Sequence, residues 1–362
     1  QDVDQDVDMQ DLFFQFTMDV FANIAFGVEL KSLERATPHP FAAAFDGAQE
    51  HAKNRLARPT WRVERLLWWL FPAERAFRRH IKVMDDFLAG VIHAKRRDAE
   101  ESRMGPDLIS RFLSKGGGFG HAEAFTDKEL RDIAANFLIA GRDTTACALS
   151  WTLFELIRNP HAAKLVREEA DRVFVEKPGG GSTEGGSKRE EDADDSMERG
   201  MLDLLSEVTF QRVTKELPYT HAVVTEALRL HPSVPNDMKS ALRDDTLPDG
   251  TKIPAHSVVV YSSFALGRNE TQFADPLVFR PERWLDKGNK SEPGMFQTAV
   301  FNATPRYCLG KPLAYLEVKL LTAVLAQRFD FSAARPLSEE YRSSLVMPML
   351  HGLATKVRVR AE

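Results

Sequence analysis

The sequence predicts a mainly α-helical fold with a small β component. Helical patterns occupy most of the chain, and short β-like runs are gathered late, between residues 232 and 264 and near the C-terminus. The chain has 362 residues, of which 43% are hydrophobic, so it can bury a large core. Length alone allows one large domain or two ordinary ones.

Composition excludes several classes of function. A net charge of −5 gives no reason to expect nucleic-acid binding. The two cysteines, Cys147 and Cys308, are too few for a disulfide framework or a four-thiolate zinc site, and the ten histidines show no HExxH spacing. No run reaches the roughly 18–20 apolar residues that span a bilayer. The chain opens with Gln on the repetitive QDVDQDVDMQD, so we expect that the true N-terminus is missing.

The first third of the chain predicts three helices. Residues 12–30 read as a buried helix that ends near Gly27, residues 41–58 as a helix with mixed faces, and residues 73–97 as an amphipathic helix with basic residues at its end. Between the last two lies TWRVERLLWWLFPAERAF, which carries three tryptophans among arginines. We expect these tryptophans to pack in the core. The alternative is an interfacial patch, because tryptophan and arginine together favour a membrane–water boundary.

A long helix follows in the middle of the chain. Thr126 and Glu129 form a Thr-x-x-Glu capping box that opens it, and the Asn-Pro dipeptide at 159–160 stops it at about Arg158. About 32 residues would span roughly 48 Å, the width of a whole domain. A second helix is expected from Pro160 to near residue 175.

The second half begins with a low-complexity stretch. Residues 176–200 are rich in Gly, Ser and charge, which predicts a disordered surface insertion. Pro218 then lies near the first turn of a helix that Pro232 stops. Short β-like runs divided by an LPDG turn follow, and a last β-like segment surrounds LVMPMLHGLATKVRV.

The long helix breaks local rules in its interior, in FLIAGRDTTACALSW. Gly141 costs about 1 kcal/mol relative to alanine there. Asp143, Thr144 and Thr145 are weak helix formers whose side chains compete for backbone hydrogen bonds. We expect the backbone to open here, to form a groove, and to present an acid and a hydroxyl side by side, which suits a proton relay. The alternative is a tolerated kink.

A carboxylate and a guanidinium lie one helical turn apart at Glu226 and Arg229. Alone, this spacing is typical of a surface salt bridge. Arg283, in PERW, could join the pair. A buried Arg–Glu–Arg cluster would fix the fold and its register and would carry no chemistry.

The stretch AVFNATPRYCLGKPLAYLEVKL places Cys308 at the end of a loop and the start of a helix. A helix N-terminus stabilises a thiolate. Arg306 can pair with an anion, Phe301 can shield the sulfur, and Gly310 lets a flat group approach the backbone. A lone cysteine is usually a packed hydrophobe, and Cys147 is read that way. For Cys308 the combination fits a thiolate ligand to a metal in a large planar cofactor.

These features, in this order, resemble the cytochrome P450 superfamily of haem-thiolate monooxygenases. The family's Phe-x-x-Gly-x-Arg-x-Cys-x-Gly motif corresponds to residues 301–310, its Ala/Gly-Gly-x-Asp/Glu-Thr motif to residues 140–144, and its Glu-x-x-Arg pair to Glu226 and Arg229, with Arg283 as the later arginine. Details such as FNATPRYCLGKPLA and LPDGTKIP look most like the eukaryotic fatty-acid ω-hydroxylase branch.

The resemblance implies a single cytochrome P450 domain over residues 1–362, incomplete at its N-terminus, with haem between the long central helix and the helix of the cysteine loop. It implies that Cys308 is the proximal ligand of the iron in haem b and that Asp143 and Thr144 carry protons to bound oxygen. Arg306 and Lys239 would contact the haem propionates. It implies further cofactor contacts for Phe301, Gly310, Ala140 and Gly141. It implies a structural role for Glu226, Arg229 and Arg283. It also implies a distal pocket near Phe137, Ala140, Val234 and Met347.

The activity implied is hydroxylation of a long apolar chain, namely the ω-hydroxylation of a fatty acid. O2 would be the oxidant and an NADPH-cytochrome reductase the electron source, since the chain has no dinucleotide-binding fingerprint. The full-length protein is expected on the cytosolic face of the endoplasmic reticulum membrane. The alternatives are a haem-thiolate isomerase or dehydratase of lipid hydroperoxides, or an inactive truncated relative. Thr304 departs from the family's glycine, and we expect strain if that position needs a glycine-only conformation.

Overall fold

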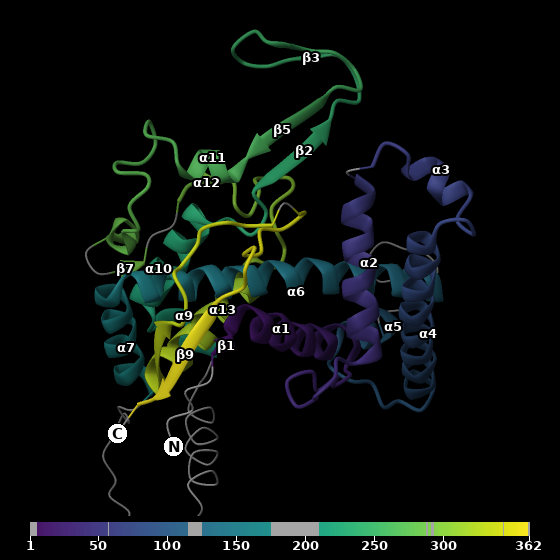
Figure 1. Ribbon diagram of the computed structural model, residues 1–362, viewed down its shortest axis with the longest axis horizontal. Helices are drawn as coiled ribbons and strands as arrows, with labels where there is room; N and C mark the ends of the chain where they lie inside the picture. Colours follow the sequence, from purple (N-terminus) through teal and green to yellow (C-terminus); the bar gives the residue numbers. More distant parts are fainter. Residues whose placement is uncertain are drawn as a thin grey trace, which may run out of the picture. The chain divides into compact units, whose positions relative to one another are not determined.

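A computed structural model confirms the mainly helical prediction (Figure 1). It describes residues 6–56, 58–114, 125–174, 210–286, 289–290, 293–342 and 344–360. The expected disordered insertion at 176–200 lies outside these residues. The chain divides into two compact units, an N-terminal unit of residues 10–146 with 343–345, and a C-terminal unit of residues 1–9, 147–342 and 346–362. Each unit is described by itself.

The N-terminal unit is built from helices. They are α1 (Met9–Phe26), α2 (Pro40–Leu56), α3 (Trp61–Leu66), α4 (Pro72–Glu100), α5 (Leu108–Ser114) and the first part of α6 (Asp127–Arg158). α1 ends where Gly27 takes a left-handed φ of 64°, which glycine adopts without steric cost. α2 packs against α4, and the rings of Phe41 and Phe87 meet there at 4.5 Å between centroids.

The expected start and stop signals of α6 are confirmed. The backbone N–H of Thr126 donates to Glu129 Oε2 at 2.8 Å, and the N–H of Glu129 donates to Thr126 Oγ1 at 3.3 Å, which is a capping box. The helix ends at Arg158, and Pro160 begins α7 (Pro160–Phe174). Local sequence therefore determined both ends of the longest helix.

The C-terminal unit packs α7, α9 (Phe210–Lys215), α10 (Pro218–Leu230) and α13 (Lys311–Arg328) around a common core. α10 is buried on every side from Thr220 to Leu230. Three shorter elements lie between α10 and α13 in the sequence: α11 (Ser263–Gly267), η1 (Pro281–Trp284) and α12 (Met295–Thr298).

The strands of the C-terminal unit form small antiparallel sheets. β1 (Val7–Asp8), β9 (Ala354–Val359) and β8 (Phe329–Ala333) form one sheet in that order. Three further pairs are β2 (Asn236–Ser240) with β5 (Val258–Ser262), β3 (Asp245–Thr246) with β4 (Lys252–Ile253), and β6 (Leu285–Asp286) with β7 (Asn289–Lys290). The β2–β5 pair extends away from α11 and α12 and carries β3 at its far end (Figure 1).

Candidate functional site

The loop that carries Cys308 is closed on itself. The backbone N–H of Cys308 donates to the carbonyl of Phe301 at 2.9 Å, and α13 begins three residues after the cysteine. The thiol of Cys308 is exposed, whereas Cys147 is completely buried. The structure therefore offers one accessible thiol, at the N-terminus of a helix, where a thiolate is stabilised.

The neighbours of Cys308 leave its surroundings open. The Arg306 side chain is exposed, and no partner of its guanidinium is found among the residues that the structure describes. A Cβ added at Gly310 would meet only the Cys308 sulfur, at 3.8 Å, so the backbone there is accessible to a flat group. Phe301 is half-buried, with its ring 5.5 Å from that of Tyr315. A cavity of about 370 Å³ adjoins the loop and is lined in part by Phe301 and Tyr315.

Thr304 does not take the conformation that would require glycine. Positive φ values in this loop occur at Ala299 (54°) and Asn302 (62°), and Thr304 is not among the positive-φ residues of the described chain. The expectation of left-handed strain at Thr304 is therefore wrong. The loop places that conformation at Ala299 and at Asn302, of which asparagine tolerates it better than most residues.

Lys239 is ion-paired within the protein. Its ammonium lies 2.7 Å from Asp237 Oδ2, and this hydrogen bond raises the pKa of Lys239. The same carboxylate oxygen accepts hydrogen bonds from the Tyr261 hydroxyl at 2.6 Å and from the Asn302 amide at 2.9 Å. The Lys239 side chain is 47% exposed, so its role at a propionate stays a prediction.

Glu226 is the centre of a buried network that includes both Arg229 and Arg283, so the pair is not the surface salt bridge that its spacing alone would indicate. Its carboxylate accepts Arg229 Nε and Nη2, both at 2.8 Å, and Arg283 Nε at 2.9 Å. The backbone N–H of Arg280 and the indole of Trp284 donate to it as well, at 2.9 and 2.8 Å. Glu226 and Arg229 have no exposed surface, so this carboxylate joins α10 to η1.

Arg229 extends the network to two loops. Its Nη1 donates to the carbonyl oxygens of Gly267 and Pro276, and its Nη2 donates to that of Val278 at 3.2 Å. A Cβ at Gly267 would lie 2.1 Å from the Arg229 carbonyl oxygen, so only glycine allows this approach. The arrangement satisfies the donors of a fully buried guanidinium, which is what a stable buried ion pair requires.

In the N-terminal unit, Asp143 is buried beside Arg142, which also pairs with the exposed Asp46. Arg142 Nη1 contacts Asp143 Oδ1 at 3.1 Å and Asp46 Oδ1 at 2.6 Å, and the guanidinium of Arg142 lies over the rings of Phe14 and Phe45. Burial raises the pKa of Asp143, and the charge of Arg142 opposes that shift. The carboxyl group is therefore held among protein groups, with 3% of the residue exposed.

Thr144 lies on a more open face of α6 than Asp143. Its hydroxyl donates to the carbonyl of Ala140 at 2.6 Å, and the helix is continuous through this point. The expected opening of the backbone is therefore wrong, because α6 is continuous, with Asp143 buried and Thr144 half-buried. Ala140 and Phe137, which precede Thr144 on the same face, are exposed, Phe137 by 42%.

Gly141 has a packing role that the sequence did not reveal. A Cβ added there would lie 1.9 Å from Cε1 of Phe21, on α1. The glycine therefore admits an aromatic ring against the backbone of α6. Its expected role at a cofactor stays a prediction.

The remaining distal-pocket candidates lie in the C-terminal unit. Val234 is half-buried, while Met347 is completely buried and its carbonyl accepts the indole N–H of Trp151 at 2.7 Å. The thiol loop belongs to one unit and the 140–144 segment to the other. That the two segments face each other across a porphyrin stays a prediction.

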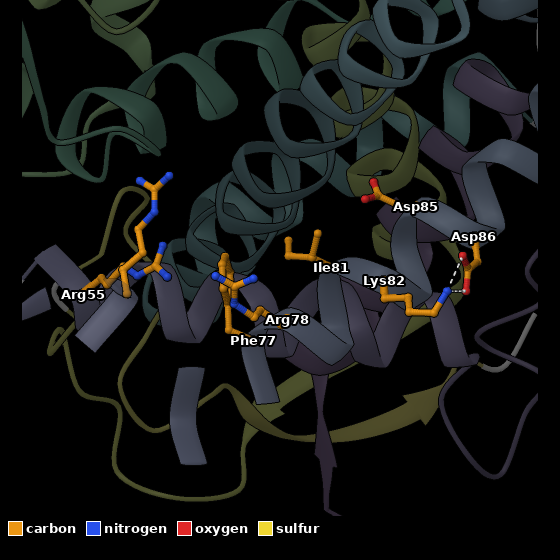
Figure 2. A pocket seen from close by; sticks show the side chains of 8 residues that line it. Arg55, Phe77, Arg78, Ile81, Lys82, Asp85 and Asp86 are labelled. Atoms are coloured by element: carbon orange, nitrogen blue, oxygen red, sulfur yellow. Dashed lines mark hydrogen bonds and ion pairs between the residues drawn. The ribbon is translucent and has the colours of Figure 1, made fainter. Parts of the chain in front are cut away.

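A larger pocket, of about 670 Å³, lies in the N-terminal unit (Figure 2). Arg55, Arg78 and Phe77 lie at one end of it, and Lys82, bonded to Asp86, at the other. It has no cysteine and no histidine in its lining. Across the described residues there is also no group of three or more His, Cys, Asp or Glu side chains that could hold a metal ion.

Sequence reasoning missed the groups that support the loop. Asp237 and Tyr261 were not singled out, and Asn302 was read only as part of a motif. The signal was available in one case, because Asp237 lies two residues before Lys239 and so shares its face of a strand. The bonds to Tyr261 and Asn302 join positions 24 and 65 residues away, and local patterns do not show them.

Comparison with known proteins gives one consistent result. A family model described as Cytochrome P450 matches residues 1–353. Cytochrome P450 704B1 of Arabidopsis thaliana is 34% identical over 375 residues, which cover 99% of the chain and 70% of that protein. Cytochrome P450 86B1 of Arabidopsis thaliana is 34% identical over 354 residues, which cover 96% of the chain and 60% of that protein.

The fold agrees with a solved structure. The crystal structure of the cytochrome P450DA heme domain matches with a TM-score of 0.78 at 24% identity, over 99% of the chain and 69% of that structure. The chain thus spans about 60–70% of the length of these proteins.

Proposed function

Because the chain belongs to the cytochrome P450 family, whose cofactor is haem b, we propose that it is a monooxygenase that hydroxylates a long-chain fatty acid at its ω end. O2 would be the oxidant, and an NADPH-cytochrome reductase would supply the electrons. The observation that carries the proposal is the single accessible thiol, Cys308, within the family's Phe-to-Gly motif and directly before α13.

The residues around Cys308 fit haem. One thiolate is enough on the protein side, because the porphyrin brings its own four nitrogen ligands. Cys308 would supply the thiolate that holds the iron, and the exposed guanidinium of Arg306 would pair with a propionate. The accessible backbone at Gly310 leaves space for a flat ring beside the sulfur. Cys147, completely buried, cannot serve as the ligand.

When bound, haem supplies the reductive cleavage of O2 and the insertion of one oxygen atom into a C–H bond. The chain's own groups would move the protons. The Thr144 hydroxyl, now bonded to the Ala140 carbonyl, can rotate to donate to a ligand on the open face of α6. Asp143 is buried beside Arg142, so its burial and this contact govern how it exchanges protons with that face. The exposed apolar side chain of Phe137 supports an apolar substrate on the same face.

The burial of Asp143 also favours a second candidate function. An isomerase or dehydratase of lipid hydroperoxides needs no proton relay to O2, and a carboxyl group locked in an ion-pair cluster is compatible with it. Turnover of a fatty-acid hydroperoxide without NADPH and reductase would support this alternative. Hydroxylation that requires both would exclude it.

Two cysteine variants test the thiolate assignment. Cys308→Ala should abolish the carbon-monoxide difference band of the reduced haem-thiolate protein, because the axial sulfur is gone. Cys147→Ala is the matched control and should keep the band, since its sulfur is buried in α6. Retention of the thiolate band in the Cys308 variant would contradict the proposal.

We also propose that the tryptophan–arginine segment, residues 55–79, contacts a membrane, in keeping with a place on the cytosolic face of the endoplasmic reticulum. Within the described residues, no helix is long and apolar enough to cross a bilayer. The prediction that the tryptophans pack in the core is wrong for Trp68 and Trp69, which are 36% and 53% exposed, and Leu66 is 72% exposed.

The charge of this segment supports the contact. It holds seven arginines and two glutamates, and both glutamates are buried. Arg55 and His51 hydrogen-bond to the buried Glu74. The exposed Arg65 and Arg78 line the pocket of Figure 2 together with Arg55. Replacing Trp68 and Trp69 by serine should weaken sedimentation with anionic vesicles, whereas Leu242→Ser, at another exposed site, should not. Equal losses would refute the contact.

A further inference from the structure

We propose that Asp237 is a positioning residue for the Cys308 loop, which it holds through the side chain of Asn302. The part that concerns haem rests on the proposed function. The part that concerns the order of the loop does not.

Asp237 joins two strands to the loop. It lies on β2 directly opposite Tyr261 on β5, and its Oδ2 accepts hydrogen bonds from Lys239, Tyr261 and Asn302 at 2.6–2.9 Å. Its Oδ1 accepts the backbone N–H of Met238 at 2.6 Å. Partial burial works against ionisation, but these hydrogen bonds hold the pKa of Asp237 well below its usual range. The carboxylate is therefore charged whenever the loop is folded at neutral pH.

Asn302 is the loop residue that hydrogen-bonds to the Asp237 carboxylate. Its φ of 62° lies in the left-handed region, and its N–H donates to the carbonyl of Ala299 at 3.1 Å. The Asn302 side chain donates to Asp237 and also lies against the hydroxyl of Tyr261. One end of the loop is thereby fixed to the β2–β5 pair.

The effect of Asp237 on the position of Cys308 passes through a single peptide group. Phe301 directly precedes Asn302, and the carbonyl of Phe301 accepts the N–H of Cys308 at 2.9 Å. If Asn302 is released, the orientation of that carbonyl is no longer fixed, and the hydrogen bond that closes the loop on the cysteine weakens. Asp237 thus acts on the position of the sulfur without touching it.

The ion pair between Asp237 and Lys239 is not enough by itself to hold the Cys308 loop in place. Lys239 and Asp237 lie on the same strand with half-exposed side chains, and such pairs contribute little to stability. The bonds from Tyr261 and Asn302 come from two other segments of the chain and are charge-assisted, so they fix the relative positions of those segments. Removing the lysine and removing the aspartate should therefore have different effects.

The experiment compares Asp237→Asn with Lys239→Gln and measures amide hydrogen exchange at Cys308 in the whole chain. Asp237→Asn keeps the shape but loses the charge that holds three donors, so exchange should be faster by about tenfold or more. Lys239→Gln keeps the bonds from Tyr261 and Asn302 and should stay within about twofold of the original chain. Amides of the β8–β9 pair report global unfolding and should not change.

Tyr261→Phe is a milder variant that keeps the test decisive if Asp237→Asn unfolds. It removes one hydroxyl, and exchange at Cys308 should rise by about threefold to tenfold. The proposal is overturned if Asp237→Asn and Tyr261→Phe leave exchange at Cys308 unchanged, or if Lys239→Gln has as large an effect as Asp237→Asn.

A spectroscopic measurement on the haem-loaded chain separates the two proposals. Asp237→Asn should convert part of the reduced carbon-monoxide spectrum from the thiolate form to a form without the thiolate bond. If the original chain took up no haem, the proposed function would fail, and the exchange result would still decide the role of Asp237.

Discussion

Replacing Glu317 by glutamine should stabilise the chain at neutral pH and have little effect in mild acid. Glu317 lies on α13 with 8% of its surface exposed, and neither of its carboxyl oxygens has a hydrogen-bond partner among the described residues. Burial without a compensating charge raises its pKa to about 8, from a reference value of 4.5. The folded chain therefore keeps a proton that the unfolded chain releases.

The size of the effect follows from the two pKa values. Below about pH 4.5 the group is protonated in both states, and stability does not depend on it. Between about pH 4.5 and pH 8 each pH unit lowers the free energy of unfolding by about 1.4 kcal/mol, because only the unfolded state loses the proton. The loss reaches about 3 kcal/mol at pH 7, stays under about 1 kcal/mol at pH 5, and is constant once the pH exceeds the folded pKa.

Urea unfolding followed by tryptophan fluorescence, at about pH 5, 6, 7 and 8, measures this difference. The free energy of unfolding of Glu317→Gln should exceed that of the original chain by an amount that grows from under about 1 to about 3 kcal/mol between pH 5 and pH 7. Glu270→Gln removes the same charge at an exposed position and should follow the original chain. A difference that does not change with pH, or a glutamine variant that is less stable throughout, would refute the reasoning.

Three further substitutions test the packing by the same unfolding measurement. Gly141→Ala should lower the free energy of unfolding by about 1–3 kcal/mol, because its Cβ would overlap the Phe21 ring. Adding Phe21→Leu to the same chain should recover part of this loss. A Gly141→Ala chain that is more stable than the original would contradict the packing argument. Glu226→Gln should cost about 3–5 kcal/mol, since it leaves buried guanidiniums without their charge partner, and a cost under about 1 kcal/mol would show that the network is not structural. Thr304→Gly should lower stability by about 0.4–1 kcal/mol, because no left-handed strain exists to relieve, whereas a gain would restore the strain argument.

Local signals in the sequence were enough to predict the ends of elements. The capping box of Thr126 and Glu129 and the proline at 160 act within one helical turn, and the structure shows them where the sequence placed them. Glu226 and Arg229 are three residues apart on one helix, so the ion pair between them could be predicted from the sequence. The family motif then identified Cys308, because a motif records a combination of residues that no single physical rule would select.

Contacts between distant parts of the chain were not predictable in the same way. The partner of Arg142 is Asp46, 96 positions earlier, and the partner of Asn302 is Asp237, 65 positions earlier. Nothing in the spacing of either pair indicates a contact, since the contact depends on how the helices and strands pack. For this reason the sequence pointed only to a propionate as the partner of Lys239, and the carboxylate of Asp237, which the structure places 2.7 Å from its ammonium, was not foreseen.

The unfavourable residues inside α6 show how one sequence signal can have several causes. A single opening of the helix was expected to explain Gly141, Asp143 and Thr144 together. The structure gives each its own reason: Gly141 admits the ring of Phe21, Asp143 enters a buried cluster with Arg142, and Thr144 bonds the backbone one turn earlier. Neighbouring positions on a helix differ by about 100° in direction, so an acid and a hydroxyl that are adjacent in sequence do not face each other directly on a continuous helix. In α6, Asp143 is buried beside Arg142 and Thr144 lies on a more open face. A substitution at Arg142 would therefore act on Asp143 directly, although Arg142 lies outside the part of the motif that carries the chemistry.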